Sequence, residues 1–314
     1  MDLVTGSKRY NDYSSYVRKH FGERVQKLSL HSGFTCPNRD GSKGTGGCTY
    51  CNNNSFNPDY CIPDKSISQQ LDEGVAFFSK RRGIKTYLAY FQSYTNTYAE
   101  ADRVIRLYEE AINHPKVIGL VIGTRPDCIS EEILTYLSGL SQSYYVSLEL
   151  GVESTLNRTL IKVNRCHTYE ETIGAFEMAK NRGIHLGAHL ILGLPGESRK
   201  ELLNHAINIS ELPVETLKIH HLQILKHTRM ASQWRQHPEN FNLFDLDSYL
   251  DLITDFIGYL RDDIIIERFI NQAPSDLLLA PNWGGLKNFE IVSKIEQLLI
   301  QKDIWQGKFY PHTL

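Results

Sequence analysis

A loop that holds three cysteines constrains this chain more than any other feature. The segment CPNRDGSKGTGGCTYC, residues 36–51, places thiols at Cys36, Cys48 and Cys51, with two residues between the last pair. Thiolates are soft ligands suited to iron–sulfur clusters and to zinc, and three on one short loop can converge on one metal centre. Four glycines between the cysteines let the backbone wrap around a bulky inorganic group. The segment therefore predicts a metal site.

The number of cysteines separates two kinds of site. A cubane of four irons held by three cysteines leaves one iron open to a substrate or cosubstrate. A structural zinc site fills four tetrahedral positions and would here take Cys61 as its fourth ligand. The spacing favours the cluster and leaves zinc open. Cys128 and Cys166, and Cys61 if zinc is absent, are expected to be incidental thiols.

Composition and charge limit the function classes. The chain has 314 residues, of which 41% are hydrophobic, enough for a barrel with an appendage. Its polar, basic N-terminal segment predicts neither a signal peptide nor a membrane span, and cysteines gathered in one loop fit the reducing cytoplasm. The formal net charge of -2 lacks the basic footprint of proteins that hold nucleic acid by its phosphates. Direct tRNA binding is therefore not favoured.

Alternating strand and helix patterns predict an α/β fold. Apolar runs bounded by helix-capping signals imply right-handed parallel crossovers, which we interpret as a partial (β/α)6 TIM-type barrel with a C-terminal α+β extension. The expected division is a basic arm over 1–24, the barrel over 25–230 and the extension over 231–314. The predicted strands are 85–91, 117–122, 144–150, 185–192, 216–225 and, in the extension, 264–269. The predicted helices are near 67–78, 104–112, 168–182, 198–212 and 246–260, with two others that begin near 131 and near 287.

Residue alternation predicts which side chains face the barrel interior. The outer face of each strand meets helices and must be apolar, so Leu148 and Leu150 point outward and leave Glu149 and Glu153 inside. By the same rule, the inward residues of the next two strands include His189, Lys218 and His220. Each alone has a structural explanation, such as an ion pair or a satisfied interior polar group. Their collection near the C-terminal strand ends, where barrel sites form, indicates an active site.

The cysteine loop resembles that of the radical S-adenosylmethionine (SAM) superfamily. The segment HSGFTCPNRDG and the later motifs FQSYTNTY, GTRPD, ELGVES, NRCHT, GLPGE and KIHHLQILK are similar to its YhcC-like branch, which is related to the elongator-subunit-like enzymes. The likeness extends from about residue 8 to residue 287. Glu153 stands where the family usually has glutamine, and Cys166 where it has glycine. These motifs are specific for the superfamily, but they do not identify the substrate.

The resemblance implies roles for individual residues. Cys36, Cys48 and Cys51 would hold a [4Fe–4S] cluster whose open iron binds the amino and carboxylate groups of SAM. The residues implied to contact SAM are Tyr50, Gln92, Ser93, Thr124, Glu149, Glu153, Arg165, His189 and Leu225. Our candidates for substrate contact or proton transfer are Asn96, Lys218, His220 and His221, with Arg268 closing the mouth. Ion pairs with barrel carboxylates are an equal alternative for Lys218 and Arg268.

The resemblance also implies the reaction. Reductive cleavage of SAM, with electrons from a donor such as flavodoxin or ferredoxin, would give a 5′-deoxyadenosyl radical that abstracts a substrate hydrogen, in the lyase or oxidoreductase class. Three hypotheses remain for the function. The substrate is a small nucleobase-like molecule, such as a queuine-type deazapurine cleaved in salvage, or it is intact tRNA. Alternatively, the chain is a zinc-binding module without catalysis.

Overall fold

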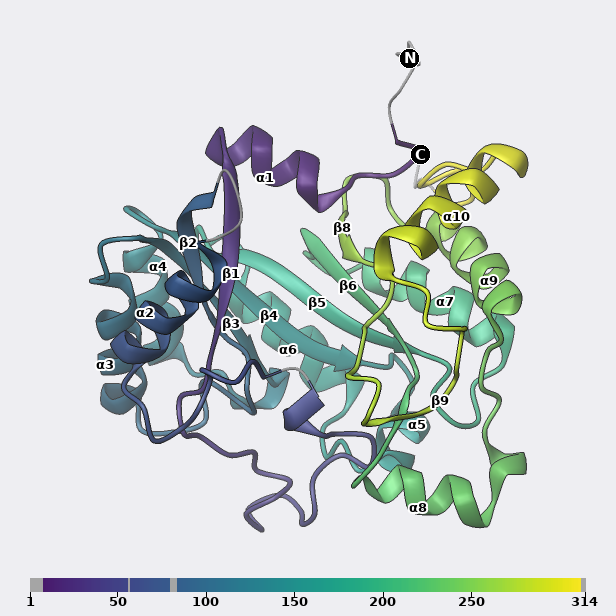
Figure 1. The fold of residues 1–314 in the computed structure, drawn as a ribbon, viewed down its shortest axis with the longest axis horizontal. Helices are drawn as coiled ribbons and strands as arrows, with labels where there is room; N and C mark the ends of the chain where they lie inside the picture. Colours follow the sequence, from purple (N-terminus) through teal and green to yellow (C-terminus); the bar gives the residue numbers. More distant parts are fainter. Residues whose placement is uncertain (1–7, 56, 80–83, 312–314) are drawn as a thin grey trace.

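Seven parallel strands form one curled sheet in the computed structural model, which describes residues 8–55, 57–79 and 84–311 (Figure 1). The order across the sheet is β1-β2-β3-β4-β5-β6-β8, and each neighbouring pair is parallel. The strands are β1 (Arg24–Leu30), β2 (Ile84–Phe91), β3 (Val117–Thr124), β4 (Tyr145–Glu153), β5 (His185–Leu192), β6 (Thr216–His221) and β8 (Ile265–Arg268). Two short strands, β7 (Ile224–Leu225) and β9 (Leu278–Ala280), pair antiparallel beside it. The predicted partial barrel is confirmed.

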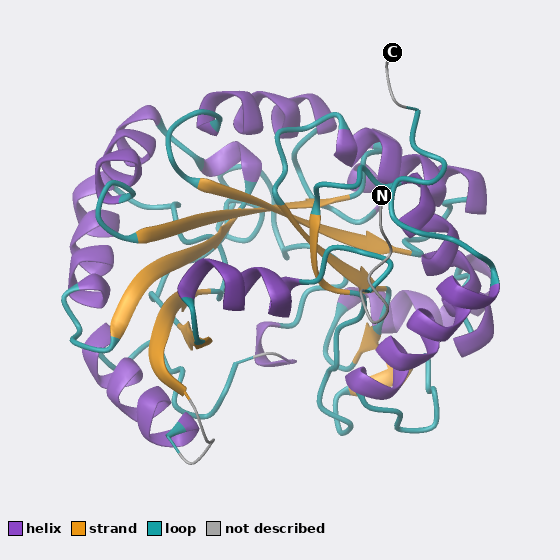
Figure 2. Ribbon diagram, turned by 90° about the horizontal axis from the view of Figure 1, so that it is seen from above, coloured by secondary structure: helices purple, strands orange, loops and turns teal. Residues whose placement is uncertain are grey.

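Ten α-helices of the described residues lie around the sheet, and most of them cover its convex face (Figure 2). They are α1 (Tyr13–Phe21), α2 (Ile67–Phe78), α3 (Ala101–Ile112), α4 (Glu131–Leu140), α5 (Asn157–Lys162), α6 (Tyr169–Ala179), α7 (Arg199–Ser210), α8 (Arg229–Gln236), α9 (Leu246–Tyr259) and α10 (Asn288–Gln301), with 3-10 turns at Asn53–Ser55, Pro126–Cys128 and Pro238–Asn240. The predicted capping box forms at α6, where Thr168 Oγ1 accepts from the Glu171 amide and Glu171 Oε2 accepts from the Thr168 amide. Such reciprocal bonds fix where this helix begins.

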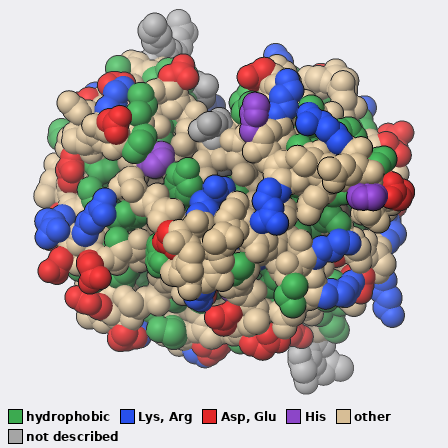
Figure 3. Space-filling view, turned by 90° about the horizontal axis from the view of Figure 1, so that it is seen from below, with side chains coloured by type: hydrophobic (Ala, Val, Ile, Leu, Met, Phe, Trp, Pro, Cys, Tyr) green, Lys and Arg blue, Asp and Glu red, His purple; other side chains and the backbone are tan. Residues whose placement is uncertain are grey.

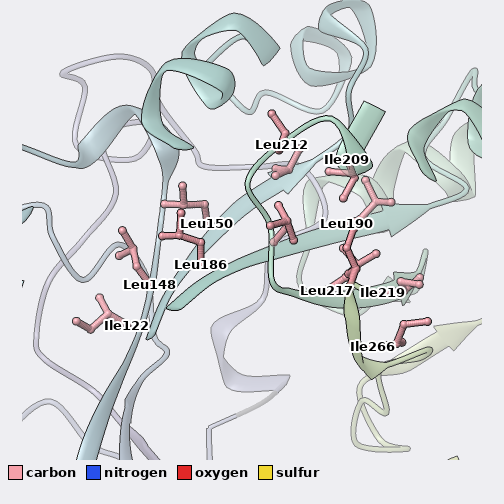
Figure 4. Packing of buried hydrophobic residues seen from close by; sticks show 14 of the residues in the cluster. Ile122, Leu148, Leu150, Leu186, Leu190, Ile209, Leu212, Leu217, Ile219 and Ile266 are labelled. Carbon is pink, nitrogen blue, oxygen red and sulfur yellow. The ribbon is translucent and has the colours of Figure 1, made fainter. Parts of the chain in front are cut away.

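The hydrophobic core lies between the strands and these helices. Leu148 and Leu150 of β4 are fully buried and pack in one cluster with Leu190 of β5 and Leu217 of β6 (Figure 4). Their sequence neighbours face the other way, into the barrel. The orientation predicted from alternation is confirmed, because an outer strand face that meets helices must be apolar.

The structure differs from the predicted elements at both edges of the barrel. Strand β8, expected in the extension, pairs with β6 as the seventh strand of the sheet. The predicted strand 216–225 is interrupted: β6 ends at His221, and β7 turns away to pair with β9. Strand β1 and helices α1, α5 and α8 were not predicted as such. Charged side chains interrupt the apolar pattern in β1, and α1 carries just one buried residue, Val17.

The first and last strands of the sheet are joined by side chains. Lys27 of β1 lies 2.7 Å from Glu267 Oε2 of β8 and 3.0 Å from Glu149 Oε1 of β4. Lys218 of β6 lies 2.5 Å from Glu149 Oε2 and 3.3 Å from Glu267 Oε1. These four residues, which we call the interior ion network, span the seam between the two edge strands. Helix α1 contacts both β1 and β8 and covers the seam where these strands begin (Figure 1).

The N-terminal and C-terminal segments both pack on the barrel. Residues 1–7 of the expected basic arm lie outside the described part of the chain, and the rest of that arm forms α1 and the turns around it. In the expected extension, α9 contacts α7 and α10 contacts α9. Within the described residues, none of the helices has the length and apolar character needed to cross a membrane.

We expect Glu267→Gln to destabilise the fold by about 3 kcal/mol, because it leaves a positive charge unbalanced in the interior ion network. The free energy of unfolding in urea would measure this loss. Glu73→Gln is the matched control: Glu73 is 47% exposed in its pair with Lys65, and its loss should cost less than about 0.5 kcal/mol. Equal effects of the two substitutions would contradict a role for the network in holding the seam.

Candidate active site

One large pocket opens at the C-terminal ends of the strands. It is lined by the cysteine loop, by the ends of β2 to β6 and by Arg268 of β8, and it encloses about 1250 Å³ including space open to solvent. Figure 3 shows the molecule from this side, with Lys and Arg side chains near the centre of the face. Parallel barrels place their active sites at this end. The volume is sufficient for a cofactor together with a small substrate.

The cysteine loop brings Cys36, Cys48 and Cys51 to the wall of this pocket. Each sulfur receives a hydrogen bond from a different side chain. Thr95 Oγ1 lies 3.0 Å from Cys36 Sγ, Asn38 Nδ2 lies 3.2 Å from Cys48 Sγ, and Asn53 Nδ2 lies 3.6 Å from Cys51 Sγ. Hydrogen bonds to ligating sulfurs orient them and tune the potential of an iron–sulfur cluster.

Three arginines surround the thiols with positive charge. Burial raises the pKa of Cys36, and the Thr95 hydrogen bond and the charges of Arg165 and Arg125 act against that rise. Burial and the neighbouring Cys48 raise the pKa of Cys51 to about 12, opposed by Arg39. Thiolate ligands carry negative charge, so the arginines compensate a site that holds three of them.

The donor set suits a group larger than one metal ion. Among the described side chains, no three His, Cys, Asp or Glu groups are placed to hold a single ion. Cys61, the fourth ligand that a zinc site would need, does not line the pocket; it is buried elsewhere and hydrogen-bonds Ser93. Three thiols set around a shared space, each with its own donor, fit a cluster held at three corners.

Arg165 is held against the loop by backbone and side-chain contacts. Its Nη2 donates to the Gly151 carbonyl at 2.7 Å, and its Nη1 approaches Cys48 Sγ at 3.7 Å. A side chain at position 151 would collide with this guanidinium, since a Cβ there would lie 2.5 Å from Nη2. Arg165 Nε donates to His167, whose pKa burial and then Arg165 lower to about 3. Neutral His167 therefore acts as the acceptor that orients Arg165.

Two residues that depart from the family pattern have left-handed backbone. Glu153 has φ of +66° at the end of β4, where the pairing with β5 shifts register, and its Oε1 lies 3.5 Å from Arg165 Nη2. Cys166 has φ of +58°, and its sulfur lies against Gly44. Positive φ costs glycine less free energy than a residue with a Cβ, so glycine would fit position 166 with less backbone strain than cysteine.

Glu149 is the hub of the interior ion network below the pocket. Burial acts to raise its pKa, but Lys218 and Lys27 hold the pKa well below its ordinary value. Its Oε2 also accepts a hydrogen bond from His189 Nε2 at 2.9 Å. Burial lowers the pKa of His189, so its ring is neutral and donates to the carboxylate. Glu149 thereby fixes the orientation of a residue in the pocket wall.

Most of the residues predicted to contact SAM line the same pocket. These are Tyr50, Gln92, Thr124, Glu149, Glu153, Arg165, His189 and Leu225. Ser93 does not: it is fully buried, and its hydroxyl donates to Asn57 Oδ1 at 2.7 Å. The Ser93 hydroxyl is thus engaged within the protein, and a contact between this residue and SAM stays a prediction.

Two predicted substrate contacts are structural in this fold. Asn96 is fully buried, its Nδ2 donates to the carbonyls of Phe91 and Gly123, and its Oδ1 accepts from Ser32. Lys218 lies in the interior ion network, the alternative that the sequence left open, and does not line the pocket. Burial lowers the pKa of Lys218 to about 8 against the opposing effect of Glu149 and Glu267.

The other predicted substrate contacts lie on the β6–β8 side. His220 and Arg268 line the pocket, and the His220 ring stacks with His189 at 5.9 Å between centroids. His221 borders the pocket, but its ring stacks on Trp283 at 4.2 Å. Alternation along β6 explains this, because His221 points away from the side that His220 faces.

Several residues at the site were not predicted from the sequence. Arg125, in the GTRPD motif, pairs with Asp127 through Nε and Nη2 at 2.9 Å, whereas its buried Nη1 has no partner in the described structure. Asn38, Asn53 and Thr95 supply the hydrogen bonds to sulfur. The motif GTRPD was available as a signal for Arg125. The three residues that donate hydrogen bonds to sulfur gave no such signal in the sequence, because polar residues in loops are common.

Comparison with known proteins decides the family. The model of the Radical SAM superfamily matches residues 36–207, and that of the Radical_SAM C-terminal domain matches residues 214–301. The chain belongs to the radical SAM superfamily. Enzymes of this superfamily use a [4Fe–4S] cluster and SAM, the two groups that the resemblance implied. The radical SAM match therefore replaces the zinc-module alternative.

Individual relatives agree with this assignment. The chain is 36% identical to protein YhcC of Escherichia coli (strain K12) over 277 residues, 88% of each chain. It is 32% identical to YtqA of Bacillus subtilis (strain 168) over 305 residues, 96% of this radical SAM chain and 93% of YtqA. Among solved structures, the archaeal Methanocaldococcus infernus Elp3 shares the fold, with a TM-score of 0.68 and 15% identity, over 90% of this chain and 64% of Elp3.

We expect Cys166→Gly to stabilise this radical SAM protein. Left-handed backbone costs a residue with a side chain about 1–2 kcal/mol, and glycine adds about 0.4–1 kcal/mol of unfolded-state entropy, so the net gain is about 0.5–1 kcal/mol. Urea unfolding of the metal-free protein would measure it. Cys166→Ala removes the thiol and keeps the Cβ, so it should give no gain. Equal gains for both would attribute the effect to the thiol.

Proposed function

We propose that Cys36, Cys48 and Cys51 hold a [4Fe–4S] cluster with which the protein cleaves SAM reductively. When bound, the cluster would supply one electron for the cleavage of SAM into methionine and a 5′-deoxyadenosyl radical, which would abstract a hydrogen atom from the substrate. The observation that carries the proposal is the set of three pocket-lining thiols, each with its own hydrogen-bond donor. The class of reaction, lyase or oxidoreductase, belongs to the same proposal.

We assign the binding of SAM to the pocket wall next to the cysteine loop. Arg125 Nη1, buried and without a partner, is suited to an anionic group such as the SAM carboxylate. Glu153 and Thr124 supply oxygen atoms for the amino group or the ribose, with Gln92, Arg165 and His189 on the same wall. Tyr50 and Leu225 supply apolar surface for the adenine. Glu149 acts through His189 as a positioning residue.

For the substrate we propose a small nucleobase-like molecule connected with tRNA modification or salvage, for which queuine-type lyase chemistry is one form. The size of the pocket and the formal net charge of -2 support a small molecule over a folded RNA. The second candidate is intact tRNA. It is favoured by the match to the tRNA uridine(34) acetyltransferase of Methanocaldococcus infernus, 28% identical over 124 residues, 38% of this chain. Salt-sensitive tRNA binding would support the second candidate.

The proposed reaction also needs a source of electrons. We propose a small one-electron carrier, such as flavodoxin or ferredoxin, as the partner, and the reducing cytoplasm as the compartment. The thiols of the loop must stay reduced to ligate iron, which is consistent with that compartment.

The test is anaerobic reconstitution with iron and sulfide followed by reduction in the presence of SAM. We expect about four irons per chain and the formation of 5′-deoxyadenosine and methionine. Cys48→Ala should lose both, whereas Cys61→Ala, which alters a thiol outside the pocket, should keep both. A colourless protein that holds one zinc and loses it in Cys61→Ala would instead establish the zinc module.

We expect Thr95→Val to lower the reduction potential of the bound cluster. The valine keeps the shape of threonine but removes the hydrogen bond to Cys36, which stabilises the more negative, reduced cluster. A hydrogen bond worth about 1 kcal/mol corresponds to a decrease of tens of millivolts in a one-electron couple. An anaerobic redox titration followed by electron paramagnetic resonance would measure the change. Thr135→Val, on the exposed face of helix α4, should leave the potential unchanged.

A further inference from the structure

The pocket wall between β6 and β8 carries polar groups that lack partners. Arg268, at the end of β8, makes a long hydrogen bond to Asn271 Oδ1 at 3.3 Å. Within the described part of the chain, no carboxylate lies within 4.0 Å of its guanidinium nitrogens. A register shift between β6 and β8 precedes Arg268, so it reaches the pocket although Glu267 beside it points into the interior.

Within the residues that the structure describes, two atoms on this wall are buried without a hydrogen-bond partner. Gln223 Nε2 donates to the Asn271 carbonyl at 3.1 Å, which fixes the amide and leaves Oε1 as an unused acceptor. His220 Nε2 is also buried and unpaired. Buried polar atoms without partners cost free energy, so their presence in a pocket indicates groups that a ligand completes.

The charges near this wall do not balance. The interior ion network contains two lysines and two glutamates, and Arg268 adds one positive charge to it. The neighbouring histidines do not change the net charge. Burial and then Arg268 hold the pKa of His220 well below its ordinary value, and His189 is neutral too. An anionic ligand group would neutralise the remaining charge.

We propose that Arg268, with His220 and Gln223, forms a subsite for an anionic group of the substrate, a carboxylate or a phosphate, and for an N–H donor next to it. The subsite rests on the proposed function and narrows its substrate class to acidic nucleobase-like molecules. Arg268 binds the anion, and Gln223 Oε1 accepts a hydrogen bond from the N–H group of the substrate. Arg268 lies on β8, the last strand of the sheet, whereas Arg125 follows β3, so this anion is distinct from the carboxylate that we assign to Arg125.

Two matched pairs of probes test the subsite. Orotate differs from uracil by a carboxylate, and uridine 5′-monophosphate differs from uridine by a phosphate. Calorimetry with the cluster-loaded, SAM-bound protein should show that at least one acidic member binds about tenfold to a hundredfold more tightly than its neutral partner. The pair that shows the preference distinguishes carboxylate from phosphate.

Variants of Arg268 give the decisive comparison. Arg268→Gln should abolish the preference for the acidic probe, Arg268→Lys should keep part of it, and Arg106→Gln, on the exposed face of α3, should keep all of it. Equal binding of acidic and neutral probes, failure of all four to bind, or an unchanged preference in Arg268→Gln would each overturn the subsite.

The same preparations separate this inference from the proposed function. Formation of 5′-deoxyadenosine by reduced protein and SAM without a probe should be equal in wild type and Arg106→Gln. Loss of this activity in Arg268→Gln would assign Arg268 to SAM and overturn the subsite alone. Absence of the activity in the wild-type protein would overturn the proposed function itself.

Discussion

The interior ion network is the interaction on which the rest of the structure depends. Lys27, Glu149, Lys218 and Glu267 come from four strands, and each charge is compensated by the others in a space from which water is largely excluded. A single buried charge would be strongly unfavourable, so the four must be present together. The network holds the first and last strands at a fixed separation. Through the bond from His189 to Glu149, it also sets the floor of the pocket.

The pocket has two walls with different chemistry. The wall formed within residues 36–207 carries the thiols and the arginines that compensate them, and it coincides with the Radical SAM superfamily match. The opposite wall, with His220, Gln223 and Arg268, lies within residues 214–301, the match to the C-terminal domain. Under the proposed function, most of the groups that bind the cofactors come from the first segment, and the groups proposed to select the substrate come from the second, which also supplies Leu225 to the adenine.

The sequence predicted the repetitive parts of the fold and the local parts of the site. Strands such as β5, whose bounds 185–192 were predicted correctly, carry an alternating pattern between clear capping signals. Strand β1 was not predicted because Lys27, which belongs to the interior ion network, interrupts its apolar residues. The cysteine loop was found because its ligands are close in sequence. The sulfur donors Asn53 and Thr95 were not, because tertiary structure alone brings them to the thiols.

The open sheet has a consequence for how this architecture can vary. In a closed barrel, strand number and shear fix the internal diameter. Here β1 and β8 are the two edges of the sheet, and salt links between long side chains bridge them. The width of the cavity can therefore change when residues at the junction are exchanged for longer or shorter ones that keep the charges paired, with the backbone ladders left intact. Enzymes built on this frame can accommodate bulkier or slimmer molecules without adding or removing a strand.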